Sequence, residues 1–158
     1  MANWDRINKL IGILEEEEEY AQSNMGGRPH FQMPEYIVVD SFKEKEQSKV
    51  TAQELKDAPR VCNLAACLAG EAILEWSHPD KIFETNYDGS INSKQAHAEG
   101  RALLELTEAE ASHMFFGYWF ALQYLLSRYV RAKITRKDAI FYLKKVIKNK
   151  NVMVNIYE

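Results

Sequence analysis

Apolar residues near the start of the chain recur at the spacing of a helix. They lie mostly three residues apart and share one face of a predicted helix: Trp4, Ile7, Leu10, Ile11 and Leu14. Five consecutive glutamates, residues 15–19, follow this face. Like charges repel one another at i,i+4 and are disfavoured at the negative end of the helix dipole. We therefore expect residues 15–19 to form a frayed, solvated helix end, in preference to an acidic docking site.

Two short stretches have strand patterns. Residues 36–40 are rich in β-branched side chains, and residues 152–157 partly alternate apolar and polar positions. We expect these two strands to pair and to join the ends of the chain. After the first strand, residues 41–57 are mostly charged and predict a surface loop, with one helical turn started by a capping box of Thr51 and Glu54.

A run of small residues, 62–72, contains both cysteines of the chain, Cys62 and Cys67. Small side chains on consecutive helical turns let another backbone approach closely, as a close-packed interior requires. We predict a helix that begins near Cys62, ends at Trp76 before the proline of the following segment, and forms the crowded centre of the fold.

Later helices have chemical start signals. These are Ser93 for a helix that reaches Leu106, Thr107 paired with Glu110, and Thr135 paired with Asp138. Residues 109–130 are the most aromatic part of the chain and predict a central helix, broken near Gly117, against which the others pack. A base-stacking or ligand platform is the alternative, but aromatic residues at helical spacing are usually core.

These patterns predict a mainly α-helical protein: a compact bundle of five or six helices with a short two-stranded β-ribbon that joins the termini. The 158 residues, 46% of them hydrophobic and 27% charged, suit one globular domain with a substantial core. Within this single domain, residues 1–158, we distinguish an N-terminal helix with a loop and strand extension, residues 1–57, from a helical core, residues 58–158.

The N-terminal residues lack the basic start and apolar core of a secretory signal, so we expect a cytoplasmic protein with reduced cysteines. The longest stretch without Asp, Glu, Lys or Arg runs from residue 111 to residue 127 and contains several polar residues. It falls short of the roughly 20 apolar residues that a membrane span needs. We therefore expect no membrane association.

Charge is unevenly distributed along the chain. The net charge is −3, yet residues 128–150 hold nine Lys or Arg residues and one acid, Asp138. Such asymmetry indicates either an anionic partner or an internal electrostatic match, and we favour the internal match. For an external anion, the expected binding residues lie near a helix N-terminus: Arg128, Arg131, Arg136 and Lys137. The remaining lysines fit the wet face of an amphipathic helix: Lys144, Lys145 and Lys148.

Metal and catalytic chemistry find little support in the sequence. Cys62 and Cys67 lie five residues apart, about 140° around a helix, so a regular helix keeps them from binding one metal. We interpret them as buried core thiols. Residues 84–95 partly imitate a calcium loop, but Glu84 and the neutral Gln95 occupy its first and last places, so we expect a turn. No phosphate loop or nucleophile elbow is present, and we predict no metal, no cofactor and no enzymatic activity.

The second part of the chain resembles a group of small bacteriophage and bacterial proteins that have no established activity. Their pattern is C-G-T-x-x-C-x-A-G followed by an apolar helix, and the matching residues here are Cys62, Cys67, Ala69, Gly70 and Ala72. Asn63, Leu64 and Glu71 depart from the family's usual residues. Residues 102–117 are similar to the family's next helix pair. The resemblance covers about residues 58–158 and implies a mostly helical fold and a phage origin, without a mechanism.

We therefore expect a non-enzymatic binding protein. The resemblance implies a phage-encoded accessory or counter-defence protein that engages a host component, and the basic C-terminal surface is the expected contact. The alternative is a small-molecule binder that sequesters an anionic nucleotide signal at residues 128–137. The expected partner is thus a host or viral protein or an anionic small molecule, and neither nucleic acid nor a membrane. The sequence leaves a homo-oligomer open.

Overall fold

The computed structural model describes residues 1–23, 30–31, 37–39, 49–57, 64–66, 68–86, 90–129 and 134–157. Within these ranges the elements are, in chain order, α1 (Trp4–Ser23), β1 (His30–Phe31), β2 (Ile37–Val39), β3 (Lys49–Thr51), α2 (Ala52–Asp57), β4 (Leu64–Ala66), α3 (Leu68–Trp76), β5 (Ile82–Glu84), α4 (Ser93–Leu103), α5 (Glu108–Ser112), the π-helical turn η2 (His113–Gly117), α6 (Tyr118–Tyr129) and α7 (Arg136–Asn149).

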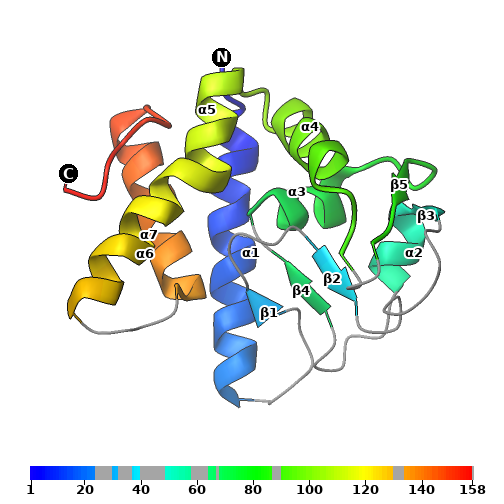
Figure 1. The fold of residues 1–158 in the computed structure, drawn as a ribbon, viewed down its shortest axis with the longest axis horizontal. Helices are drawn as coiled ribbons and strands as arrows, with labels where there is room; N and C mark the ends of the chain where they lie inside the picture. Colours follow the sequence, from blue (N-terminus) through cyan, green and yellow to red (C-terminus); the bar gives the residue numbers. More distant parts are fainter. Residues whose placement is uncertain are drawn as a thin grey trace.

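The fold is arranged around α1, which has α6 and α7 on one side and α3, α4 and both sheets on the other (Figure 1). Because α5, η2 and α6 follow one another without a break, we count them as one continuous helix, and the described residues then form six helices. The predicted mainly α-helical bundle of five or six helices is therefore confirmed. No helix within the described ranges combines the length and the apolar content needed to cross a membrane.

Helices α1 and α7 pack against each other and supply much of the core. The predicted apolar face of α1 is fully buried at Ile7, Leu10 and Leu14. The apolar residues that α7 buries are Ala139, Tyr142, Leu143 and Val146. At the far end of α7, Lys150 places its Nζ atom 5.3 Å from the ring centre of Trp4, at the start of α1. The two helices are thus antiparallel, and the end of α7 meets the beginning of α1.

Helices α3 and α4 approach each other very closely, and small residues permit this. A Cβ atom at Gly100 of α4 would lie 2.9 Å from the Cβ atom of Ala69 and 3.1 Å from Cζ of Phe115. Ala69 itself is fully buried. The prediction that the small-residue run lets another backbone come close is confirmed for its α3 part. Cys62 and Cys67 lie outside the described residues.

Part of the small-residue run is a strand and not a helix. Strand β4 pairs in parallel with β1 and antiparallel with β2, so it is the middle strand of a three-stranded sheet. The helix predicted from Cys62 therefore begins only at Leu68. Partners on both edges of β4 satisfy its backbone, and such non-local pairing overrides local helix propensity.

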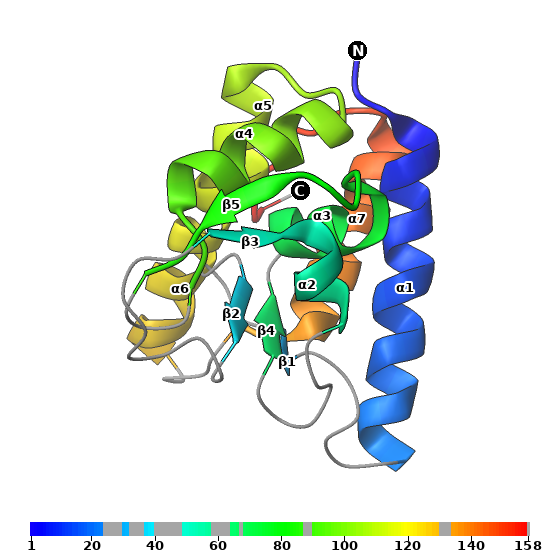
Figure 2. The ribbon, with the colours of Figure 1, turned by 90° about the vertical axis from the view of Figure 1, so that its right-hand side faces the viewer.

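The predicted strand at residues 36–40 exists as β2, but its partner is β4 and not the C-terminal segment. The predicted pairing that would join the termini is therefore wrong. The short two-stranded antiparallel ribbon that the fold does contain is formed by β3 and β5. Figure 2 shows this ribbon apart from the β1–β4–β2 sheet.

The C-terminal tail, residues 152–157, contains turns and no strand. Its alternating pattern still corresponds to burial, because Val152 and Val154 are fully buried. The Tyr142 hydroxyl donates a hydrogen bond to the Val152 carbonyl at 2.8 Å, and His113 Nε2 lies 2.6 Å from the Val154 carbonyl oxygen. Side chains from α7 and η2 thus bind the backbone of the tail in place of a partner strand.

Three helix starts follow local chemistry as predicted, and a fourth is shifted by one residue. The capping boxes are Thr51 with Glu54 at α2, Thr107 with Glu110 at α5, and Thr135 with Asp138 at α7. At α4 the cap is Asn92 and not Ser93, since the Asn92 side chain accepts a hydrogen bond from the Gln95 N–H at 3.1 Å. Asn is at least as good a cap as Ser, so the start shifts by one residue.

Candidate functional site

Two of the four predicted anion-binding residues have described side chains, and their surroundings differ. Arg128 lies in α6, but its side chain and the whole of Arg131 fall outside the described part of the chain. Lys137 is exposed on α7. Arg136, the first residue of α7, is only 8% exposed. The predicted corner is therefore divided between a solvent-facing lysine and a protein-facing arginine.

Arg136 belongs to a buried ion-pair network with α1. Its Nη1 atom donates a hydrogen bond to Oε2 of Glu18 at 3.1 Å, and its Nε atom lies 3.6 Å from Oε2 of Glu17. Glu17 is 3% exposed. In place of the predicted external anion, Arg136 binds two carboxylates of its own chain. The N-terminus of α7 adds to this attraction because the helix dipole favours negative charge there.

The glutamate run is part of this interface. Helix α1 continues through it to Ser23. Glu15 Oε2 lies 3.7 Å from Lys144 Nζ, further along α7 from Arg136. The fraying predicted for residues 15–19 is wrong, because cations of α7 offset part of the repulsion among these carboxylates, although three of the five glutamates are exposed to solvent as expected. The internal electrostatic match favoured from the sequence is present between α1 and α7.

The outer face of α7 carries another group of cations. By the outer face of α7 we mean the residues that line an open hollow of about 610 Å³: Phe141, Lys144, Lys145, Lys148 and Asn149. Phe141 is 61% exposed, and Lys145 Nζ lies 4.7 Å from the centre of its ring. Lys145 and Lys148 form no ion pair with any described residue. A large exposed ring among uncompensated charges marks this face as a candidate contact surface.

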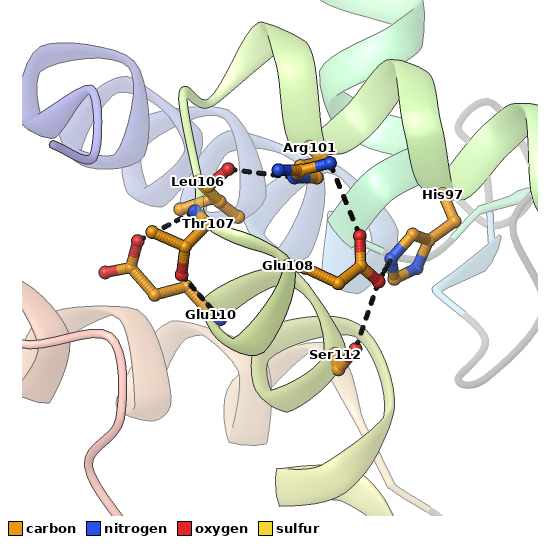
Figure 3. Close-up of polar contacts among 7 residues, drawn as sticks. All are labelled: His97, Arg101, Leu106, Thr107, Glu108, Glu110 and Ser112. Atoms are coloured by element: carbon orange, nitrogen blue, oxygen red, sulfur yellow. Dashed lines mark hydrogen bonds and ion pairs between the residues drawn. The ribbon is translucent and has the colours of Figure 1, made fainter.

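A polar cluster joins α4 to α5 (Figure 3). The Glu108 carboxylate lies between two side chains, with Oε1 3.0 Å from His97 Nε2 and Oε2 3.4 Å from Arg101 Nη1. The Ser112 hydroxyl donates to Glu108 Oε1 at 3.4 Å, and Arg101 Nε donates to the Leu106 carbonyl at 3.1 Å. The cluster thus ties together both ends of the bend between the two helices.

The histidine of this α4–α5 cluster is held by aromatic rings. His97 stacks on Phe116 with ring centres 5.7 Å apart, and it meets Phe115 edge-on at 5.6 Å. The Ser112 hydroxyl bonds to Glu108 and not to the imidazole, so Ser112 is not placed as a nucleophile that His97 could activate. The arrangement fits a structural tie better than a catalytic one.

The predicted break near Gly117 is a π-helical turn that leaves the helix continuous. The Tyr118 N–H bonds to the His113 carbonyl, five residues earlier. The Trp119 indole N–H donates to the Met114 carbonyl at 2.5 Å. π-Helical turns occur frequently at functional sites. The glycine signalled an irregularity in the sequence, but nothing there indicated its type.

An aromatic hollow of about 410 Å³ lies beside this turn, between η2, α6 and the tail. Its lining includes His113, Gly117, Tyr118, Tyr124, Asn155 and Tyr157. Burial raises the pKa of the Tyr118 hydroxyl, and the negative charge of Asp138 raises it further. Burial also raises the pKa of Tyr142, whose ring centre lies 4.3 Å from that of Tyr118. Both hydroxyls therefore stay protonated around neutral pH.

The calcium-like loop of residues 84–95 leads into α4 through backbone contacts. Residues 87–89 of this loop lie outside the described part. The Asn92 N–H bonds to the Glu84 carbonyl at 2.7 Å, and Gln95 Oε1 accepts the Glu84 N–H at 2.7 Å. The Gln95 side-chain oxygen, at the position of a calcium ligand, thus accepts a backbone hydrogen bond. In the described ranges, which omit both cysteines, no three His, Cys, Asp or Glu side chains gather to hold a metal.

The chain matches no protein-family model, no curated protein and no solved structure. Two surfaces of the described residues are candidates for function: the outer face of α7 and the aromatic hollow. Sequence reasoning missed Phe141 on the outer face. Its signal was its place three and four residues before Lys144 and Lys145, which puts it on the polar side of the helix.

Proposed function

We propose that this protein is a non-enzymatic binding protein that docks an acidic partner protein on the outer face of α7. The observation that carries the proposal is Phe141, a ring left 61% exposed beside three lysines. Aromatic side chains surrounded by polar residues are typical energetic centres of protein interfaces. Phe141 is the expected anchor, and the lysines form the rim.

The charge of this face defines the partner. Lys145 and Lys148 make no ion pair with described residues, so carboxylates of a partner would meet cations that are not yet matched. The residues that line the outer face all belong to one helix, so the hollow is open and not walled. An open face suits a broad protein contact better than enclosure of a small molecule. The fitting partner has an apolar pocket with acidic residues around it.

The resemblance of residues 58–158 to small phage and bacterial proteins supports a wider setting for this binding. In that setting the protein is a phage-encoded accessory or counter-defence protein, and the acidic partner is a component of the bacterial host. The geometry of α7 and the resemblance are separate grounds, and the first does not depend on the second.

The test begins with a photo-crosslinking amino acid at position 141, which captures the partner from bacterial lysate. Binding of the purified partner is then measured by calorimetry with wild type and with Lys145→Glu/Lys148→Glu. We expect at least a tenfold loss of affinity, and affinity that falls with added salt.

The matched control is Lys81→Glu/Lys94→Glu, which changes the same charge on exposed residues outside α7. It should bind as wild type does. Equal loss in both double variants would mean that net charge, and not the outer face of α7, drives binding, and would overturn the proposal.

A nucleotide is the second candidate ligand, because Lys145 lies over the Phe141 ring and could meet a phosphate while the ring stacks on a base. The same protein is heated with ATP, GTP and cyclic nucleotides. If the melting temperature rises with a nucleotide, and this rise disappears in Phe141→Ala, the ligand of the outer face is a nucleotide and not a protein. We expect no such rise.

A further inference from the structure

We propose that the aromatic hollow binds a small, uncharged heteroaromatic molecule that donates a ring N–H to Nδ1 of His113. The volume of about 410 Å³ lies within the roughly 300–1,000 Å³ of small-molecule sites. No charged side chain is among the described residues that line it. This site shares no residue with the outer face of α7, so it does not depend on the proposed function.

The acceptor arises from the way His113 holds the tail. Its Nε2 atom lies 2.6 Å from the Val154 carbonyl oxygen, which can only accept, so Nε2 carries the proton. In the neutral ring, Nδ1 then has a lone pair and no proton. No described residue donates to Nδ1. The contact that fixes the tail therefore also leaves one acceptor available to a ligand.

Gly117 keeps the approach to this acceptor open. A Cβ atom at this position would lie 3.6 Å from His113 Nδ1 and 3.7 Å from the Ser112 carbonyl oxygen. Both are ordinary contact distances, so alanine would fit without a clash. It would nevertheless put a methyl group in van der Waals contact with Nδ1 and crowd a ligand that donates to this atom.

The walls of the hollow select a flat molecule. Tyr124 of α6 and Tyr157 of the tail line it while remaining 66% and 83% exposed. Such rings offer stacking surface that a planar ligand would bury. Stacking selects an aromatic plane, and the single nitrogen acceptor selects a ring N–H. Indoles, benzimidazoles and purine bases share this chemistry.

The test uses probes in matched pairs: indole, benzimidazole and adenine, each beside its derivative methylated at the ring N–H. Binding is measured by calorimetry. We expect at least one N–H probe to bind, at least ten times more tightly than its methylated partner, and the probe that binds distinguishes an indole-type from a purine-type ligand.

Gly117→Ala is the matched variant. It should lose at least tenfold in affinity for that probe, while its melting temperature stays equal or rises because alanine is the better helix former. Nitrogen-15 NMR of His113 should show the proton on Nε2, and the Nδ1 resonance should shift when the probe binds. Failure of every N–H probe to bind, undiminished binding by Gly117→Ala, or a proton on Nδ1 would each overturn the proposal.

Discussion

Two charge networks connect pairs of helices in this protein, and they differ in burial. Between α1 and α7, Arg136 is 8% exposed and faces two carboxylates. Between α4 and α5, the Glu108 side chain is 64% exposed and faces His97 and Arg101. Both networks bridge two helices with similar chemistry. Water screens the second network far more than the first.

The comparison shows that the type of a charged residue does not determine whether it stabilises the fold of this protein. Breaking a buried pair leaves a charge that water cannot reach, whereas water replaces the partner at an exposed one. Arg136 and Lys148 both belong to α7, yet Arg136 is buried against carboxylates of α1 and Lys148 is exposed to solvent. Burial separates a structural cation from one available to a partner.

The largest expected effect comes from breaking the buried network. Arg136→Ala should lower the free energy of unfolding by about 3–5 kcal/mol, because the carboxylates of α1 would remain in a poorly hydrated site without the positive charge that pairs with them. Urea denaturation measures this. The neighbouring exposed Lys137→Ala should change stability by less than about 0.5 kcal/mol. A loss below 1 kcal/mol in Arg136→Ala would remove the distinction between the networks.

A second test uses an uncharged buried group on the same helix. Tyr142→Phe removes the donor to the Val152 carbonyl and should cost about 1–3 kcal/mol, because that buried acceptor loses its hydrogen bond. The exposed Tyr157→Phe is the control and should leave the free energy of unfolding unchanged. A cost in Tyr142→Phe no larger than in the control would show that the tail does not depend on this contact.

The same residue predicts a pH dependence. The pKa of Tyr142 is raised in the folded state, so the unfolded chain loses its proton first as pH rises. The stability that this provides is complete below pH 10, the ordinary tyrosine pKa, and declines above it. Denaturation between pH 8 and pH 11 should show a decline in wild type that is shallower in Tyr142→Phe. Equal slopes would contradict the raised pKa.

A smaller effect is expected from the exposed network. Glu108→Gln should cost about 0.2–1 kcal/mol and should cost less in 1 M NaCl, where screening acts over about 3 Å. The cost of Arg136→Ala should persist in the same salt. Urea denaturation at low and high salt separates the two networks, and an equal response to salt would show that burial does not distinguish them.

The smallest effect on stability is expected on the outer face of α7. Lys148→Ala should change the free energy of unfolding by no more than about 0.5 kcal/mol, since this exposed lysine has no ion pair among the described residues. Circular dichroism during heating measures it. A large loss would make Lys148 a structural cation like Arg136.

Local features of the fold were predictable from the sequence. Thr107 with Glu110 and Thr135 with Asp138 mark helix starts because a capping box needs only residues three apart. The apolar face of α1 is equally local. The place of Phe141 on the polar side of α7 could also have been predicted from helical spacing.

Features made by distant residues were not predictable. Strand β4 depends on β1 and β2 at its two edges, and neither contact is visible in the small residues of β4 itself. The partner of Arg136 in the internal match could not be named from the sequence, because Glu18 lies 118 residues away in the chain. The acceptor at His113 depends in the same way on Val154, 41 residues further along the chain.

The pairing of α1 with α7 also fixes an order of events during synthesis. Helix α1 leaves the ribosome first, and at about 5–20 residues per second it waits on the order of ten seconds for α7. During that time its apolar face and its glutamates lack the helix that covers and neutralises them. Since contacts of such long sequence separation form slowly, the part of the core between α1 and α7 is completed only after α7 has been made.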